Sequence, residues 1–283
     1  MQAKNLVKPN IGFMQGRLSK IRNNRIQSFP WGVWEDEFSC AFDIDLTKME
    51  WTIDSENFEE NPLIAPSGSS KIIDLASKFD IEINTVTCDY FMENPPWKTN
   101  LTQVKENMVS ILKGMSEIDS QILVIPLVDN SSLVDSKNIE VVKLFFTDLM
   151  PEIIENNLRI AFESDFNPKN LLDFINRFDR NYFGINYDIG NSASLGFNPT
   201  EEFKAYGSRI INVHVKDRKL SGTTVPLGEG DADFLRIFRL LHEENYQGNL
   251  ILQTARSQEG QDAKVLVQYK KLIEDWWEEA RID

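Results

Sequence analysis

The sequence predicts a (β/α)₈ barrel, and three observations favour this fold class. Short apolar runs rich in β-branched residues alternate with helical patterns from one end of the chain to the other. Eight such strand–helix units occupy about 250 residues, the usual size of this barrel. The first turn, MQGRL, lacks the glycine-rich pattern that opens a doubly wound sheet, the alternative fold. No change in composition marks a boundary, so we expect one domain over residues 1–283.

The expected strands are short apolar runs that end in polar residues. They cover residues 11–15, 49–53, 81–87, 122–128, 159–163, 183–187, 209–218 and 250–254. The seventh, RIINVHVKDR, contains His214, one of two histidines in the chain. Because side chains alternate along a strand, Asn212, His214 and Lys216 should lie on one face.

The expected helices follow from apolar residues that recur with the helical period. Val104, Met108 and Ile111 predict a helix over residues 99–118. Asp231 is the expected N-cap of the helix that begins at the next residue. The other helices are expected over residues 34–42, 70–79, 141–155, 169–178, 200–206, 232–244 and 262–280.

The composition argues against several classes of protein. A net charge of −14 at neutral pH disfavours binding to a nucleic-acid backbone. Cys40 and Cys88 are too few for a disulfide framework and are typical of reduced thiols. The N-terminal residues lack the apolar core of a signal peptide, and no apolar run approaches the ~20 residues of a membrane span. We therefore expect a cytoplasmic protein that binds neither nucleic acid nor membrane.

Four consecutive expected strands each place a group that can bind a metal just before the following loop. These groups are Glu163, Asp188, His214 and Gln253. Neighbouring strands lie about 4.8 Å apart, so the four side chains could surround one ion. Two carboxylates, an imidazole and an amide oxygen suit Mn²⁺ or Mg²⁺, and Zn²⁺, Fe²⁺ or Co²⁺ are compatible. The alternative is four ordinary strand-end residues that meet solvent.

Cations are expected at the same end of the barrel. They are Arg17, Lys216, Arg218 and Arg256. In so acidic a chain, this cluster indicates an anionic substrate group, a phosphate or a carboxylate. The alternative is salt bridges to Asp89, Asp165 and Asp217. The loop 226–230 leads into a helix N-terminus that could bind an anion, but Glu229 and Asp231 would repel a phosphate there.

Several segments resemble the xylose isomerase-like TIM-barrel family of sugar phosphate isomerases and epimerases. They are IGFMQGRLS, QSFPW, MEW, AFESD, NYDIGNSASLG, HVKDR, PLGEGDADF and LILQTAR, which run nearly from end to end. The resemblance implies a barrel with one divalent metal, often Mn²⁺, at its C-terminal mouth. The family includes ketose 3-epimerases, hexulose phosphate isomerases, and dehydratases of keto-inositol and dehydroshikimate type.

Carried over by position, the family's metal ligands fall on Glu163, Asp188 and His214. Gln253 stands where the family usually has a second glutamate, and Asn191 stands where epimerases tend to have a histidine. In ketose 3-epimerases the two glutamates exchange protons on opposite faces of the substrate. A glutamine cannot do this, so epimerisation would require Lys216 in place of the missing glutamate.

The resemblance thus implies a metal-dependent isomerase or epimerase that acts on a sugar or sugar phosphate through an enediolate. Glu163 is the expected base, Lys216 the expected acid or anion-binding group, and Gln253 their neighbour in the catalytic site. The expected substrate contacts are Arg17, Asn191, Lys216, Arg218 and Arg256.

Alternatives remain open. A metal-dependent dehydratase and a non-catalytic sugar-binding relative also fit the residues. DNA-repair endonucleases of the same superfamily bind three zinc ions through many histidines. This chain has two histidines, which are too few for such a site. Family members are often dimers or tetramers, so the resemblance is also compatible with a homo-oligomer.

Overall fold

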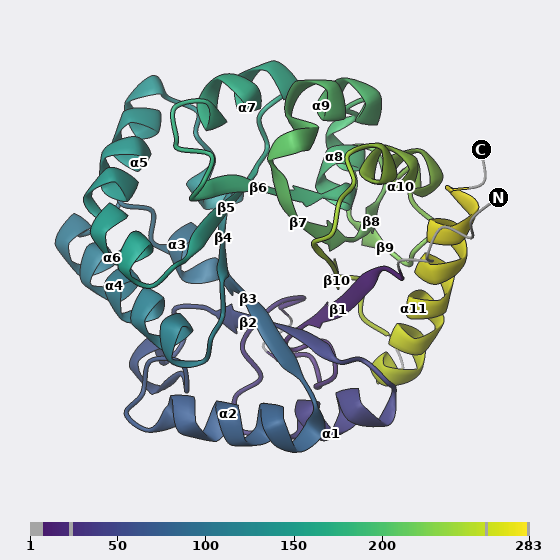
Figure 1. Ribbon diagram of the computed structural model, residues 1–283, viewed down its shortest axis with the longest axis horizontal. Coiled ribbons are helices and arrows are strands. Elements are labelled where there is room, and N and C mark those ends of the chain that lie inside the picture. The colour runs from purple at the N-terminus through teal and green to yellow at the C-terminus, as the bar shows by residue number, and fades with distance from the viewer. Residues whose placement is uncertain (1–7, 23–24, 258–259, 282–283) are drawn as a thin grey trace.

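A closed barrel of eight parallel strands forms the centre of the molecule, and helices surround it (Figure 1). The protein's structure is a computed structural model that describes residues 8–22, 25–257 and 260–281. Around the barrel the strand order is β1-β10-β7-β6-β5-β4-β3-β2. The strands are β1 (Asn10–Met14), β2 (Lys48–Ile53), β3 (Glu82–Cys88), β4 (Ile122–Leu127), β5 (Arg159–Ser164), β6 (Phe183–Asp188), β7 (Ile210–Val215) and β10 (Asn249–Leu252). The predicted fold class is confirmed.

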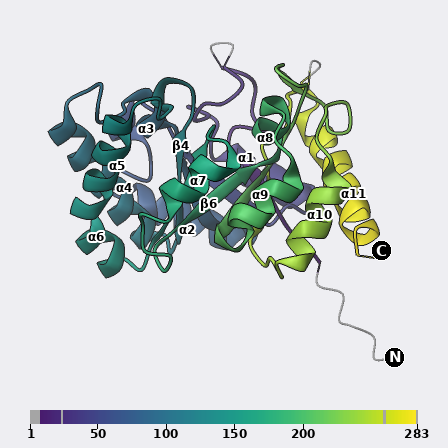
Figure 2. The same ribbon diagram turned by 90° about the horizontal axis from the view of Figure 1, so that it is seen from above.

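The helices between the strands form the outer layer. The larger ones are α1 (Asp36–Asp43), α2 (Gly68–Phe79), α4 (Leu101–Glu117), α5 (Ser136–Asp148), α6 (Met150–Glu155), α7 (Pro168–Ile175), α9 (Pro199–Tyr206), α10 (Phe234–Glu243) and α11 (Asp262–Glu279). Two short helices directly follow strands, α3 (Asp89–Glu93) after β3 and α8 (Ile189–Leu195) after β6. They lie toward the same end of the barrel (Figure 2). Neither was predicted, because five to seven residues are too few to show a helical period.

Three predicted boundaries were wrong for local reasons. The segment 141–155 is two helices that meet at Leu149, since Pro151 in the first turn of α6 has no N–H to continue α5. Asp233, not Asp231, caps α10 by accepting a hydrogen bond from the Arg236 N–H at 3.0 Å. The seventh strand ends at Val215, and residues Asp217–Arg218 (β8) pair instead with Thr224–Val225 (β9).

The two faces of β7 show how the barrel separates polar and apolar side chains. Val213 and Val215 belong to the hydrophobic core, which includes residues of the surrounding helices. Asn212 and His214 alternate with them and contact Glu50, on a strand that is not a neighbour of β7. The interior of the barrel is therefore polar at the level where the site is built.

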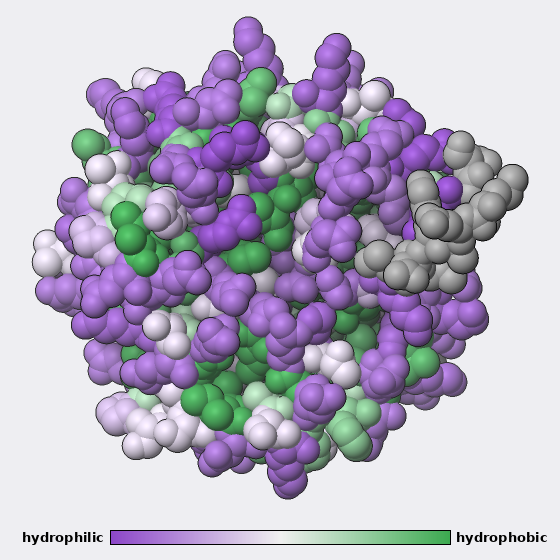
Figure 3. Space-filling view, in the orientation of Figure 1, coloured by the Kyte–Doolittle hydropathy of each residue, from purple (hydrophilic) through white to green (hydrophobic). Residues whose placement is uncertain are grey.

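The outer surface fits the acidic composition. The face in Figure 3 is mostly hydrophilic, with smaller apolar areas between the charged side chains. Within the described residues, every helix is too short or too polar to cross a bilayer.

Candidate metal centre

Three of the four predicted metal ligands converge at the carboxyl ends of neighbouring strands. Glu163 lies near the end of β5, Asp188 ends β6 and His214 lies near the end of β7. One ligand atom from each lies within 4.8 Å of the other two. All three are buried. Adjacent parallel strands in register therefore bring together residues that are about 25 positions apart in the chain.

Gln253 and Lys216 complete the edge of this group. The Lys216 Nζ donates to Gln253 Oε1 at 3.0 Å and lies 2.6 Å from Asp188 Oδ2. Gln253 therefore joins the three residues through the ammonium of Lys216. Its own role as a metal ligand stays a prediction.

Asn191 and Arg218 hold the carboxylates in place. The Asn191 side-chain amide donates to Glu163 Oε1 at 2.7 Å, and its backbone N–H donates to Asp188 Oδ1 at 2.8 Å. Arg218 in turn donates to Asn191 Oδ1 at 2.8 Å. Both residues lie beside the three ligands and are bound to the protein's own polar groups, and a substrate contact by either stays a prediction.

The other two predicted substrate contacts bind mainly backbone carbonyl groups. Arg17 donates to the carbonyl oxygens of Ile26 at 2.7 Å and Thr254 at 3.1 Å. Arg256 donates to those of Gly16 and Ser19. These bonds tie the loop after β1 to the segment after β10. A substrate contact by either arginine stays a prediction.

The loop 226–230 binds a carboxylate of the chain itself. Asp217 Oδ2 accepts hydrogen bonds from the backbone N–H groups of Gly228 at 2.9 Å and Gly230 at 2.8 Å. A Cβ at Gly230 would lie 1.8 Å from Asp217 Oδ1, so only glycine fits there. Asp217 thus occupies the backbone amides that the sequence offered for a substrate anion.

Glu50 is a site residue that the sequence interpretation missed. It lies in β2, is completely buried, and its Oε1 is 2.7 Å from His214 Nε2. The signal was present in KMEWTI, where Glu50 shares a strand face with Lys48 and Thr52, opposite Met49 and Trp51. A carboxylate in mid-strand on the inward face of a barrel requires a buried partner.

The pKa values of the three converging residues are set by two opposing effects, burial and the charges of their neighbours. Burial alone would lower the pKa of His214, but the charges and hydrogen bonds of Glu50 and Glu163 raise it to about 10. Burial would raise the pKa of Glu163, but His214 and Lys216 bring it below its ordinary value. Burial raises the pKa of Asp188, the Glu163 charge adds to this, and Lys216 opposes it. Glu163 is therefore ionised at neutral pH.

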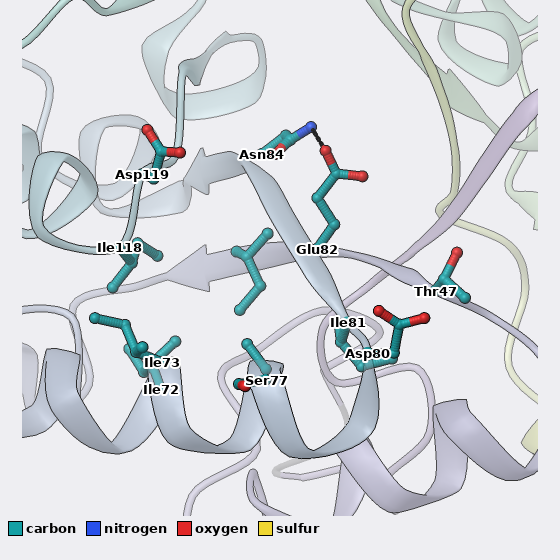
Figure 4. Close-up of a pocket in the computed structure, with 12 residues that line it drawn as sticks. Thr47, Ile72, Ile73, Ser77, Asp80, Ile81, Glu82, Asn84, Ile118 and Asp119 are labelled. Carbon is teal, nitrogen blue, oxygen red and sulfur yellow. Dashed lines mark hydrogen bonds between the residues drawn. The ribbon is translucent and has the colours of Figure 1, made fainter.

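A second hollow lies at the opposite end of the barrel, where strands begin (Figure 4). It has a volume of about 660 Å³, and its lining includes Ile72 and Ile81 with Glu82, Asn84 and Asp119. Glu82 and Asn84 are hydrogen-bonded to each other. The group of possible metal ligands found in the described residues lies at the other end. The volume of this hollow is therefore not evidence that it is the functional site.

Comparison with known proteins places the chain in a family. A family model described as "Xylose isomerase-like TIM barrel" matches residues 44–278. A putative L-ribulose-5-phosphate 3-epimerase, SgbU, from Escherichia coli (strain K12) is 30% identical over 106 residues, which cover 35% of this chain and 37% of that protein. An inosose dehydratase from Clostridium botulinum (strain Eklund 17B / Type B) is 36% identical over 94 residues, 26% of this chain and 31% of that protein. The chain thus matches only about a third of the length of these two relatives.

Solved structures share the fold over nearly the whole chain. The IOLI protein with a bound zinc atom has a TM-score of 0.75 at 14% identity and covers 96% of this chain and 99% of its own. A xylose isomerase-like TIM-barrel protein from Mycobacterium smegmatis in complex with magnesium has a TM-score of 0.73 at 14% identity, covering 96% and 97%. With the family model matched over most of its length, the chain belongs to the xylose isomerase-like TIM-barrel family.

Proposed function

We propose that the protein is a divalent-metal-dependent isomerase or epimerase that acts on a sugar or sugar phosphate through an enediolate. The observation that carries this proposal is the convergence of Glu163, Asp188 and His214 at the carboxyl end of the barrel. In barrels of this kind the chemistry takes place at that end. Relatives named as an epimerase and as a dehydratase support the reaction class.

The residues present fit a divalent metal. Two carboxylates and an imidazole within 4.8 Å of one another are a donor set that Mn²⁺ accepts readily, and Mg²⁺, Zn²⁺, Co²⁺ and Fe²⁺ are compatible with it. Glu163, Asp188 and His214 would hold the ion, with Gln253 as a fourth ligand. Structural neighbours named with zinc and with magnesium support a metal without fixing which one.

Glu163 is the proposed base. A bound metal would polarise the substrate carbonyl and stabilise the negative charge of the enediolate. The ionised Glu163 would accept a proton from the carbon beside the carbonyl and return it to the former carbonyl carbon. The hydroxyl proton of the first carbon would pass to the former carbonyl oxygen, which completes an isomerisation. Lys216 would donate a hydrogen bond to a substrate oxygen. Gln253 does not titrate, so one-base chemistry fits these residues better than two-base epimerisation does.

A dehydratase is the second candidate, because the Lys216 ammonium lies 2.6 Å from Asp188 Oδ2 and 3.0 Å from Gln253 Oε1, where it can serve as an acid. Here Glu163 would remove the proton from carbon while Lys216 gives its proton to the leaving hydroxyl, which departs as water. The relative named inosose dehydratase supports this reading. The products differ in composition, since dehydration removes one water and isomerisation removes nothing.

The contacts of the cations at the barrel mouth indicate whether the substrate carries a phosphate. Because Arg17 and Arg256 donate mainly to backbone carbonyls, they favour a neutral sugar over a sugar phosphate on the β1–β10 side. Lys216 and Arg218 lie nearer the three ligands and remain the proposed contacts for substrate oxygens.

Deuterium exchange tests the proposal. The Mn²⁺-loaded protein would be incubated in D₂O with a panel of keto sugars, inososes and sugar phosphates, and the products analysed by mass spectrometry. We expect exchange at carbon with the wild type and a loss of about 10²- to 10⁴-fold in Glu163→Gln. Glu201→Gln, at an exposed position of α9, is the matched control and should exchange at the wild-type rate. Equal exchange by Glu163→Gln would exclude Glu163 as the base, and sugar binding without exchange would favour a non-catalytic protein.

A further inference from the structure

A closed ring of buried polar side chains lies inside the barrel and shares two residues with the candidate metal centre. It comprises Glu50 from β2, Glu163 from β5, Asn186 from β6, and Asn212 and His214 from β7. His214 Nε2 is 2.7 Å from Glu50 Oε1, and its Nδ1 is 3.1 Å from Glu163 Oε2. The amides of Asn186 and Asn212 complete the ring, and Asn186 Nδ2 also lies 3.0 Å from His214 Nδ1.

The two asparagines connect the two carboxylates. Asn212 Nδ2 donates to Glu50 Oε2 at 2.9 Å and to Asn186 Oδ1 at 3.0 Å. Asn186 Nδ2 donates to Glu163 Oε2 at 2.8 Å. Each link depends on the next, because turning either amide would leave a buried group without its partner. The ring therefore fixes Glu50 and Glu163 relative to each other and to the imidazole between them.

We propose that Glu50 is a positioning residue that fixes the proton of His214 on Nε2, so that Nδ1 is the nitrogen that binds the metal. This inference rests on the proposed metal centre. An ionised carboxylate only accepts hydrogen bonds, so the nitrogen that faces Glu50 must carry hydrogen. A histidine that binds a metal is neutral and has one N–H, so in the metal-bound state its lone pair would lie on Nδ1, the atom on the Glu163 side.

Glu50 itself is held as an orienting group. Its Oε1 also accepts a hydrogen bond from the Thr87 hydroxyl, and its Oε2 accepts one from Asn212. It contacts the Nε2 side of the imidazole, whereas Glu163 contacts the Nδ1 side. A carboxylate in this position restricts rotation of the ring and makes the opposite nitrogen a stronger ligand. Loss of such a partner typically weakens metal binding by about 10- to 100-fold.

A neutral substitution should disturb this arrangement. In Glu50→Gln the amide is nearly the size of the carboxylate but has both a donor and an acceptor. If its NH₂ group faces His214, the proton of the imidazole moves to Nδ1 and blocks the metal. If its oxygen faces His214, the NH₂ group meets the Asn212 donor instead. Either arrangement opposes metal binding without removing any proposed ligand.

Two measurements that do not depend on turnover test the proposal. In calorimetric titrations with Mn²⁺, Glu50→Gln should bind about 10- to 100-fold more weakly than the wild type. Glu37→Gln is the matched control, because Glu37 is also a buried glutamate but accepts hydrogen bonds from the Gly16 and Leu18 N–H groups. It should bind Mn²⁺ as the wild type does. Equal affinity of a folded Glu50→Gln would overturn the proposal.

The second measurement needs no variant. The ¹⁵N shifts of the imidazole in the Zn²⁺-loaded wild type report which nitrogen holds the metal and which the proton. His242, in α10 with its Nε2 3.0 Å from the Trp277 carbonyl oxygen, is the internal reference. We expect His214 to hold zinc through Nδ1 and hydrogen on Nε2, and the opposite assignment would overturn the proposal. A wild type that binds neither ion would overturn the metal centre as well, whereas metal binding without turnover would count only against the proposed reaction.

Discussion

The two sides of the barrel mouth carry polar residues that follow strand ends, but these residues make different contacts. On the β5–β7 side, Glu163, Asp188 and His214 direct their side chains toward one another. On the β1–β10 side, Arg17 and Arg256 direct theirs at backbone carbonyls of the loop that follows β1. Both groups follow strand ends in the sequence and both were predicted to be functional. A position at a strand end therefore predicts that a residue lies at the barrel mouth. Which groups its side chain contacts depends on the conformation of the neighbouring loops.

A matched pair of substitutions tests this comparison with the largest expected effects. Lys216→Met should lower turnover by about 10²- to 10⁴-fold with a small change in stability, because Lys216 contacts Asp188 and Gln253 at the site. Arg17→Met should lower the free energy of unfolding by about 2–4 kcal/mol, because it leaves the buried Thr254 carbonyl and the partly buried Ile26 carbonyl without their donor. Urea denaturation and steady-state kinetics on both proteins measure the two effects. A loss of stability in Lys216→Met together with a loss of turnover alone in Arg17→Met would contradict the distinction between a catalytic and a structural side of the barrel mouth.

Asp89 gives a pH-dependent effect on stability. It is buried in α3, and burial, with the charges of Glu93 and Asp54, raises its pKa to about 7. Because the folded state holds this proton more tightly than the unfolded chain, stability falls as pH rises from about 4 to 7. Asp89→Asn should therefore be more stable than the wild type at pH 8, on the order of 2 kcal/mol, and equal to it near pH 4.

Thermal unfolding of the metal-free proteins across this pH range is the measurement. Asp173→Asn, at an exposed position of α7, is the control and should follow the wild type at every pH. A difference between Asp89→Asn and the wild type that stays constant with pH would show that Asp89 does not titrate as stated.

Gln253→Glu should have the smallest effect and tests whether residue 253, which follows β10, is a metal ligand. The substitution adds a second carboxylate beside Lys216, where the family usually has one. We expect Mn²⁺ to bind about tenfold more tightly, since an anionic ligand replaces a neutral one. Any 3-epimerase activity should increase relative to isomerisation, because a second group can then exchange protons. Unchanged affinity in calorimetry would place Gln253 outside the metal centre.

Much of this arrangement could be predicted from the sequence. Alternating apolar runs located all eight strands, and the polar residues at their ends led to Glu163, Asp188 and His214. Glu50 could not be assigned a role in the same way, because its partner His214 lies across the barrel and 164 positions away. The Arg17 contacts depend on a loop without a regular pattern. The break at Leu149 comes from Pro151, and the apolar pattern on both sides of the proline does not show it.

Metal analysis of the purified protein tests the central claim most directly. After dialysis against Mn²⁺ and removal of the free ion, the wild type should retain about one Mn²⁺ per chain, and His214→Ala should retain almost none because one of three converging ligands is gone. A wild type without bound metal, or a folded His214→Ala that retains as much as the wild type, would contradict the claim.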